Sequence, residues 1–312
     1  MEMELRRKGR FGRAMKTEWP LYLFLLPALL VTIIFAYLPI FTNVIAFMDY
    51  KFTKGWMGLA SPWVGFKNFV DLFHDKEFPP LIWRTFYYSV LRLVLGHPAP
   101  FILALLINEA RSRLVKRTVQ TIYYLPHFVS WTVIASLTYW FLTTDIEGLV
   151  NNIRQMLGAQ NRIIFMKYPE NFPWILVITG MIKETGWGTI IYLAAISGVD
   201  AQLYEAAKID GAGRWGQFVH VTFPSILPTT VILLIFAFGS LFASNFDQIF
   251  NLQNDIIRYD TNTISVYSYW KGVWAGRYSL ATAAGLFQGV INAILLLSVN
   301  WLGKKASGHG FF

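Results

Sequence analysis

Long apolar segments alternate with polar segments along this 312-residue chain, and that alternation limits the folds open to it. Six segments of 20 residues or more are apolar enough to cross a bilayer, namely 19–45, 82–108, 122–142, 173–196, 225–247 and 281–302. At about 1.5 Å per residue, each can span a hydrocarbon core of about 30 Å. Because lipid offers no partner for backbone N–H and C=O groups, these segments must be helical. The sequence therefore predicts an all-α, polytopic membrane protein with six transmembrane helices.

Basic side chains set the expected orientation. With the N-terminus inside, the inner segments 1–18, 109–121, 197–224 and 303–312 carry twice as many Lys and Arg as Asp and Glu, whereas the outer segments carry equal numbers. Basic residues are enriched on the cytoplasmic side of membrane proteins. We therefore expect a basic cytoplasmic N-terminal segment at 1–18, a transmembrane domain at 19–302 with a cytoplasmic loop at 201–224, and a cytoplasmic tail at 303–312.

Composition and missing motifs exclude several functions. The net charge of +9 lies beside the predicted spans, where it faces anionic lipid, and no base-reading element accompanies it, so we expect no nucleic-acid partner. The chain has no cysteine, and its five histidines lack metal-ligand spacing. The only Gly-Lys pair, Gly303-Lys304, is not part of a phosphate-binding loop. We therefore expect no metal, no cofactor and no enzymatic activity in this chain.

A polar insert with several glycines, YEAAKIDGAGRWGQFVHVTFP at 204–224, separates two apolar runs. Asp200 is expected to cap a helix over 201–210, and Gly211 to end that helix in the left-handed conformation. A second short helix is expected at about 213–221, before Pro224 begins the next membrane helix. Such a compact helix–turn–helix is either a docking surface for a soluble partner or an amphipathic linker without a partner.

The insert resembles the EAA motif of permease subunits of type I, binding-protein-dependent ABC importers. The matching residues are Glu205, Ala206, Ala207, Asp210, Gly211, Ala212 and Pro224. In that family the motif forms a coupling helix that sits in a groove of the ATPase. One departure is Phe223, where leucine usually precedes the proline, and we expect only a local change in packing. This resemblance favours a docking surface over a linker without a partner.

Other segments resemble the carbohydrate-importing branch of these importers, including Tyr37-Leu38-Pro39, Val64-Gly65-Phe66, Asn108-Glu109 and Trp187-Gly188. The resemblance implies the MetI-like permease fold in a bacterial cytoplasmic membrane and the uptake of oligosaccharides released from polysaccharides. It also implies four kinds of partner: a second permease subunit, expected to be a different chain, two ATP-binding subunits that hold ATP and Mg, an extracytoplasmic sugar-binding protein, and membrane lipid. The alternatives are a related permease for a non-sugar solute and a non-transport membrane scaffold.

Three charged side chains lie about ten residues inside predicted spans: Arg92, Lys183 and Glu184. They sit at similar depth, roughly 15 Å from the outer boundary, where a charge is costly unless it is paired or wetted. We hypothesise that all three line the translocation cavity or a gate, with Arg92 and Glu184 as an ion pair. The alternative is a pair with a purely structural role.

Sugar sites combine aromatic faces with amides and carboxylates. Candidate ligands are Trp187 and Tyr192 in the fourth span, Asn245, Asp247 and Gln248 at the end of the fifth span, and Gln288 and Asn292 in the sixth. The alternative for each is a hydrogen bond to a neighbouring helix. Span six also contains Gly285-x-x-x-Gly289, which predicts a close helix contact within the subunit or across a dimer.

Overall fold

The computed structural model describes residues 19–54, 58, 60–243 and 245–307. Over these residues the chain is helical, and its only extended pairing is an isolated bridge between Met48 and Trp63. The predicted basic segment 1–18 and residues 308–312 of the predicted tail lie outside the described residues. The first part of that tail is not separate, because α16 (Tyr278–Ser307) continues through it.

Four helical runs in the described chain are long and apolar enough to cross a membrane: Trp19–Phe47, Phe78–Glu109, Arg214–Gly239 and Tyr278–Lys305. The first contains α2 (Trp19–Thr32), η1 (Ile33–Tyr37) and η2 (Leu38–Phe47). The second contains α4 (Phe78–Leu91), η4 (Arg92–Gly96) and α5 (Pro98–Glu109). The third contains α11 (Arg214–Gln217), η8 (Phe218–Thr222) and α12 (Phe223–Gly239), and the fourth is α16.

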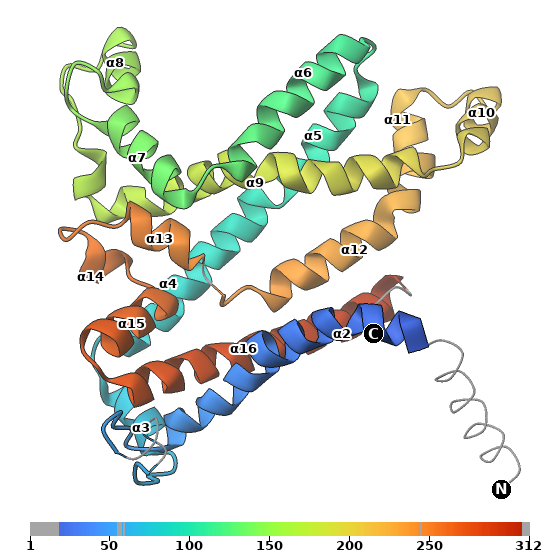
Figure 1. Cartoon of the computed structure of the whole chain (residues 1–312). Coiled ribbons are helices and arrows are strands. Elements are labelled where there is room, and N and C mark those ends of the chain that lie inside the picture. The colour runs from blue at the N-terminus through green and yellow to red at the C-terminus, as the bar shows by residue number, and fades with distance from the viewer. Residues whose placement is uncertain (1–18, 55–57, 59, 244, 308–312) are drawn as a thin grey trace, which may run out of the picture.

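The predicted fourth span is α9 (Phe172–Ser197), a helix of 26 residues at the centre of the bundle (Figure 1). It is long enough to cross a membrane, but its adjacent charges Lys183 and Glu184 lower its hydropathy, and it is not among the four apolar runs. It packs against α5, α6, η4 and α12. The bundle is therefore organised around a long helix that carries two adjacent charged residues.

The predicted third span, 122–142, is wrong as one continuous helix. It contains the end of α6 (Arg113–Tyr124), the short turn η5 (Leu125–Phe128) and α7 (Trp131–Leu142). Pro126 lacks a backbone N–H, and Ser130 starts a new helix by accepting a hydrogen bond from the N–H of Val133 at 3.3 Å. α7 has 12 residues, or about 18 Å, which is shorter than a hydrocarbon core of about 30 Å.

The predicted fifth span also ends too late. α12 ends at Gly239, and 246–252 forms the separate helix α13 (Phe246–Leu252). Both polar groups of Phe242 in the connection are bonded by α16, because Gln288 Nε2 donates to its carbonyl and Asn292 Oδ1 accepts from its N–H at 2.8 Å. The chain therefore leaves α12 without stranding backbone groups.

Short helices gather at one end of the molecule: α3 (Lys67–His74), α8 (Leu149–Met156), α13, α14 (Arg258–Thr261) and α15 (Ile264–Tyr269) (Figure 1). Two 3-10 turns, η6 (Phe165–Lys167) and η7 (Pro169–Asn171), precede α9, and the π-helical segment η9 (Trp270–Trp274) follows α15. The opposite end holds α10 (Ala201–Ile209), α11 and the C-terminal end of α16.

One charged network joins the short helices at the first of these ends. Lys271 Nζ lies 3.2 Å from Asp75 and 3.1 Å from Glu77, and the Tyr267 hydroxyl donates to Asp75 at 2.7 Å. Burial alone would raise the pKa of Asp75. The hydrogen bonds from Tyr267, the Glu77 N–H and Lys271 outweigh that effect and hold the pKa below its ordinary 3.8.

Two apolar surfaces are left uncovered in the described chain. In the run from Trp19 to Phe47, none of the residues in its most apolar window is buried. On α16, a Cβ atom built at Gly285 or Gly289 would meet nothing within 4 Å. The predicted close contact at these glycines is therefore not made within the described part of this subunit.

Candidate functional site

The segment 201–224 forms two short helices that meet at a sharp turn, hereafter the elbow. Asp200 caps α10 by accepting a hydrogen bond from the N–H of Gln202 at 2.9 Å. Gly211 has φ +81°, so it ends the helix in the left-handed conformation predicted for it. The N–H of Ala212 then closes the turn on the carbonyl of Ala207 at 2.8 Å.

Hydrogen bonds between its two halves make the elbow a compact unit. The Tyr204 and Thr222 hydroxyls lie 2.9 Å apart, and Gln217 Nε2 donates to the Ala212 carbonyl at 2.9 Å. The second predicted helix, 213–221, is α11 followed by the π-helical η8, which continues into α12 through Phe223 and Pro224. α10 is therefore joined to the membrane helix α12 both through the chain and by side-chain hydrogen bonds.

The elbow presents its motif outward. Glu205, Ala206, Asp210 and Gly211 are exposed, and no carboxylate of the motif has an ion-pair partner in the described chain. The unusual Phe223 packs against Phe101 of α5 and Phe218 of η8, with ring centroids 6.4 and 6.0 Å apart. The Phe223 ring therefore contributes to the packing of α5 against η8.

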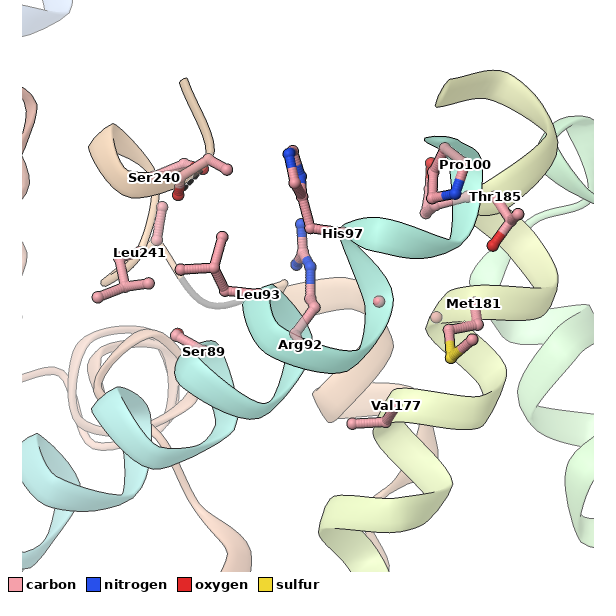
Figure 2. A pocket seen from close by; sticks show the side chains of 15 residues that line it. Ser89, Arg92, Leu93, His97, Pro100, Val177, Met181, Thr185, Ser240 and Leu241 are labelled. Carbon is pink, nitrogen blue, oxygen red and sulfur yellow. Dashed lines mark hydrogen bonds between the residues drawn. The ribbon is translucent and has the colours of Figure 1, made fainter. Parts of the chain in front are cut away.

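A cavity of about 170 Å³ lies between η4, α9 and the end of α12 (Figure 2). Of the three intramembrane charges, Arg92 and Glu184 line it. His97, which the sequence reasoning missed, projects into the same space beside Arg92. A smaller cavity of about 30 Å³ adjoins Arg92 and is lined by Asn245 and Gln248. The structure thus brings together four of the residues predicted for a pathway.

The predicted ion pair between Arg92 and Glu184 is wrong. No carboxylate in the described chain lies within 4 Å of the Arg92 guanidinium, and Glu184 Oε2 instead contacts His127 Nδ1 at 3.1 Å. His127 is held in place by the ring of Trp187, which stacks on it with a centroid distance of 4.5 Å. The prediction considered the depth of the two charges but not the side of the helix that each one faces.

Lys183 does not line the cavity. Its Nζ donates to the carbonyls of His127 and Val129, each at 2.6 Å, and lies 5.6 Å from the centroid of the Trp131 ring. These carbonyls belong to the break between α6 and α7. Irregular backbone at membrane depth must be satisfied by protein, and Lys183 supplies the donors. Lys183 therefore has the structural role given above as the alternative, with backbone carbonyls in place of an ion pair.

Residues 96–308 match the family model described as "Binding-protein-dependent transport system inner membrane component". The chain belongs to this family. It is 41% identical over 299 residues to Protein LplB of Bacillus subtilis (strain 168), covering 96% of this chain and 93% of that protein. It is 40% identical over 292 residues to the polygalacturonan/rhamnogalacturonan transport system permease protein YteP of the same organism, covering 94% and 90%.

Solved structures support the same family. The chain is 36% identical, with a TM-score of 0.85, to a chain of a bacterial ABC transporter involved in the import of the acidic polysaccharide alginate, covering 95% of this chain and 99% of that one. A second structure, the alginate transporter in complex with an alginate pentasaccharide-bound periplasmic protein, gives a TM-score of 0.86. The all-helical permease fold is therefore confirmed, and the chain is a membrane transport subunit rather than an enzyme.

Several predicted ligands have structural partners inside this permease. Tyr192 is 2% exposed and packs edge-on against Phe101 at 5.4 Å. Gln248 is buried, and its Nε2 donates to the Leu176 carbonyl at 2.7 Å and to Thr179 Oγ1 at 2.9 Å, which ties α13 to α9.

The remaining candidates lie away from both cavities. Trp187 contacts His127, and Gln288 and Asn292 bond the backbone of Phe242. Asp247 is exposed at the end of the molecule that holds the short helices. None of these four lines the cavity of 170 Å³ or the one of 30 Å³.

Proposed function

We propose that this chain is one permease subunit of an ATP-driven importer of oligosaccharides, which a sugar-binding protein delivers from outside. Two separate ATP-binding subunits would hold ATP and Mg and would dock on the elbow. We also propose that the chain crosses a bacterial cytoplasmic membrane six times, with the third crossing broken between α6 and α7, and that both termini lie in the cytoplasm. The observation that carries it is the exposed, internally bonded elbow bearing Glu205 and Gly211 in a chain of this family.

The arrangement of the ends supports the orientation. The elbow and the C-terminal end of α16 lie at one end of the molecule, opposite the short helices (Figure 1). This is the pattern expected if the basic segments face the cytoplasm and the segments predicted to lie outside form the short helices. The short helices would then form the surface that receives the binding protein.

The open apolar faces support a second permease subunit. A translocation path needs walls on all sides, and the residues that line the cavity beside Arg92 come from the continuous run α4–η4–α5, from α9 and from the end of α12 with the connection after it. Gly285 and Gly289 offer a flat surface where another helix can approach closely. We propose that a second, different permease chain completes the path.

The relatives favour sugar over other solutes. YteP is a polygalacturonan/rhamnogalacturonan permease, and the solved transporters import alginate. The second candidate is a permease for a non-sugar solute. A screen for the solutes that the partner binding protein binds would decide between the two candidates. A membrane scaffold without transport would show no substrate-stimulated ATP hydrolysis in the reconstituted complex.

The elbow is tested by reversing the charge of Glu205. Glu205→Lys is expected to abolish co-purification of the ATP-binding subunits and uptake, while leaving the amount of membrane-inserted permease unchanged. Asp247→Lys is the matched control, because it makes the same change at an exposed carboxylate at the other end of the molecule and should retain the ATP-binding subunits. Full association and uptake in Glu205→Lys would contradict the docking role.

A further inference from the structure

The segment His97-Pro98-Ala99-Pro100 widens the helix next to the cavity. Pro98 and Pro100 have no backbone N–H, so they cannot donate to the preceding turn. The helix responds with the π-helical turn η4, in which the N–H of His97 bonds to the carbonyl of Arg92, five residues earlier, at 3.2 Å. Turns of this type are often found at functional sites.

The wide turn places two nitrogen-rich side chains side by side. The hydrogen bond of η4 joins residues five apart, and Figure 2 shows Arg92 and His97 projecting to the same side of the helix. Both line the cavity of about 170 Å³. In a regular α-helix of 3.6 residues per turn, the two would point about 140° apart.

Neither side chain has an anionic partner in the described chain. Arg92 has no carboxylate within 4 Å, and the buried Nε2 of His97 has no hydrogen-bond partner. Glu184 is the one acidic group that lines the cavity. Its Oε2 contacts the Nδ1 of His127, a residue of the turn η5 between α6 and α7. Arg92 is exposed toward the cavity, and an arginine held at membrane depth without an ion-pair partner is costly, so the position favours an arriving anion.

The chemistry of the pair selects the anion. A guanidinium donates two parallel N–H bonds in a fork that matches a carboxylate, and an imidazole N–H can add a third. Arg92 supplies one permanent positive charge, and Glu184 across the cavity disfavours a dianion such as a phosphate ester. Apolar walls from Leu93, Val177 and Leu241, with the hydroxyl of Ser89, fit the remaining faces of a sugar ring.

We infer that Arg92 and His97 form a subsite for the carboxylate of a uronic acid residue, so the cargo is an acidic oligosaccharide. The inference rests on the proposed transport function and specifies its substrate class. At about 170 Å³, the cavity is smaller than the roughly 300–1,000 Å³ of sites that enclose a drug-sized ligand. The subsite therefore holds one ring of the chain at a time.

The test uses the complete transporter, reconstituted in vesicles with its binding protein. Its probes are trigalacturonate and the neutral trimer made by reducing its carboxyl groups. Arg92→Gln is expected to raise the trigalacturonate concentration for half-maximal ATP-dependent uptake at least tenfold, because two charge-assisted hydrogen bonds to the carboxylate are lost. The same concentration for the neutral trimer should change less than twofold. His97→Gln should give a smaller loss of the same selectivity.

Two further variants keep the result interpretable. Arg92→Lys preserves the charge without the fork and should give an intermediate, still selective loss, which also covers the case in which Arg92→Gln does not fold. Arg117→Gln removes a charge from an exposed position on α6 and should change the uptake of neither trigalacturonate nor the neutral trimer.

Three outcomes would overturn the inference: equal losses for both trimers in the Arg92 variants, no loss for trigalacturonate, or preference of the wild-type transporter for the neutral trimer. In each case the proposed function would survive if uptake still required ATP and the elbow. Uptake that needs neither would instead refute the proposed function.

Discussion

Among the described residues, Lys183 is the only one whose side chain bonds the His127 and Val129 carbonyls in the break between α6 and α7. Replacing it with methionine removes both bonds. Methionine has a similar length and no charge, so the packing volume is retained while two hydrogen bonds of 2.6 Å are lost. A hydrogen bond from a charged donor contributes about 1.5–3 kcal/mol. Two such bonds predict a fall of about 3–6 kcal/mol in the free energy of unfolding, because His127 and Val129 would keep unpaired, partly buried carbonyls.

The measurement is denaturant unfolding of the purified permease in mixed micelles, with Lys67→Met as the control. Lys67 is exposed, and the same substitution there should change the free energy of unfolding by less than about 0.5 kcal/mol. Folded Lys183→Met should transport with unchanged preference among saccharides, since Lys183 lies outside the cavity. A stability loss below about 1 kcal/mol, or a change in saccharide preference with wild-type stability, would refute the structural role assigned to this lysine.

Three further predictions concern other positions. A Cβ at Gly211 meets nothing within 4 Å, so the left-handed φ alone should decide how well each variant forms the elbow. Gly211→Asn should keep near wild-type uptake, Gly211→Ala should destabilise the elbow by about 1–2 kcal/mol, and Gly211→Val should destabilise it most. Equal loss of uptake in the Asn and Val variants would contradict this ranking. At Gly186 a Cβ would lie 1.9 Å from the Tyr123 carbonyl oxygen, so Gly186→Ala should reduce the yield of folded permease on size exclusion, whereas Gly285→Ala should not. The pKa of Asp75 is below 3.8, so its stabilising contribution should be constant above that pH and disappear as the pH falls through the lower folded-state value; a stability gap to Asp75→Asn that varies between pH 5 and 8 would argue against it.

The elbow could be predicted from sequence because its signals are local. Asp200 caps through its own side chain, and Gly211 occupies a backbone conformation that few other residues adopt, so neither depends on distant packing. The spans could be predicted as far as apolar content allows. Hydropathy averages over 122–142 and does not register that Pro126 ends one helix and Ser130 begins another.

The cavity could be predicted only in part, because depth along a helix does not give the direction of a side chain. Arg92 and Glu184 share a depth and a cavity, yet Glu184 faces His127, which lies 57 residues earlier in the chain. The interruption by Pro98 and Pro100 was visible in the sequence. Its consequence, a π turn that rotates His97 to the side of Arg92, depends on how the helix re-forms its hydrogen bonds.

The exposed apolar window of the first helical run, Trp19–Phe47, sets a practical condition for handling this protein. Its 29 residues form a rod of about 43 Å whose apolar window has no buried residue. In water such a surface would adhere to any similar surface, including another copy of itself. Preparations should therefore retain native lipid or the companion chain from the first extraction step, and detergent exchanged too early would yield soluble aggregates that retain a full helical signal.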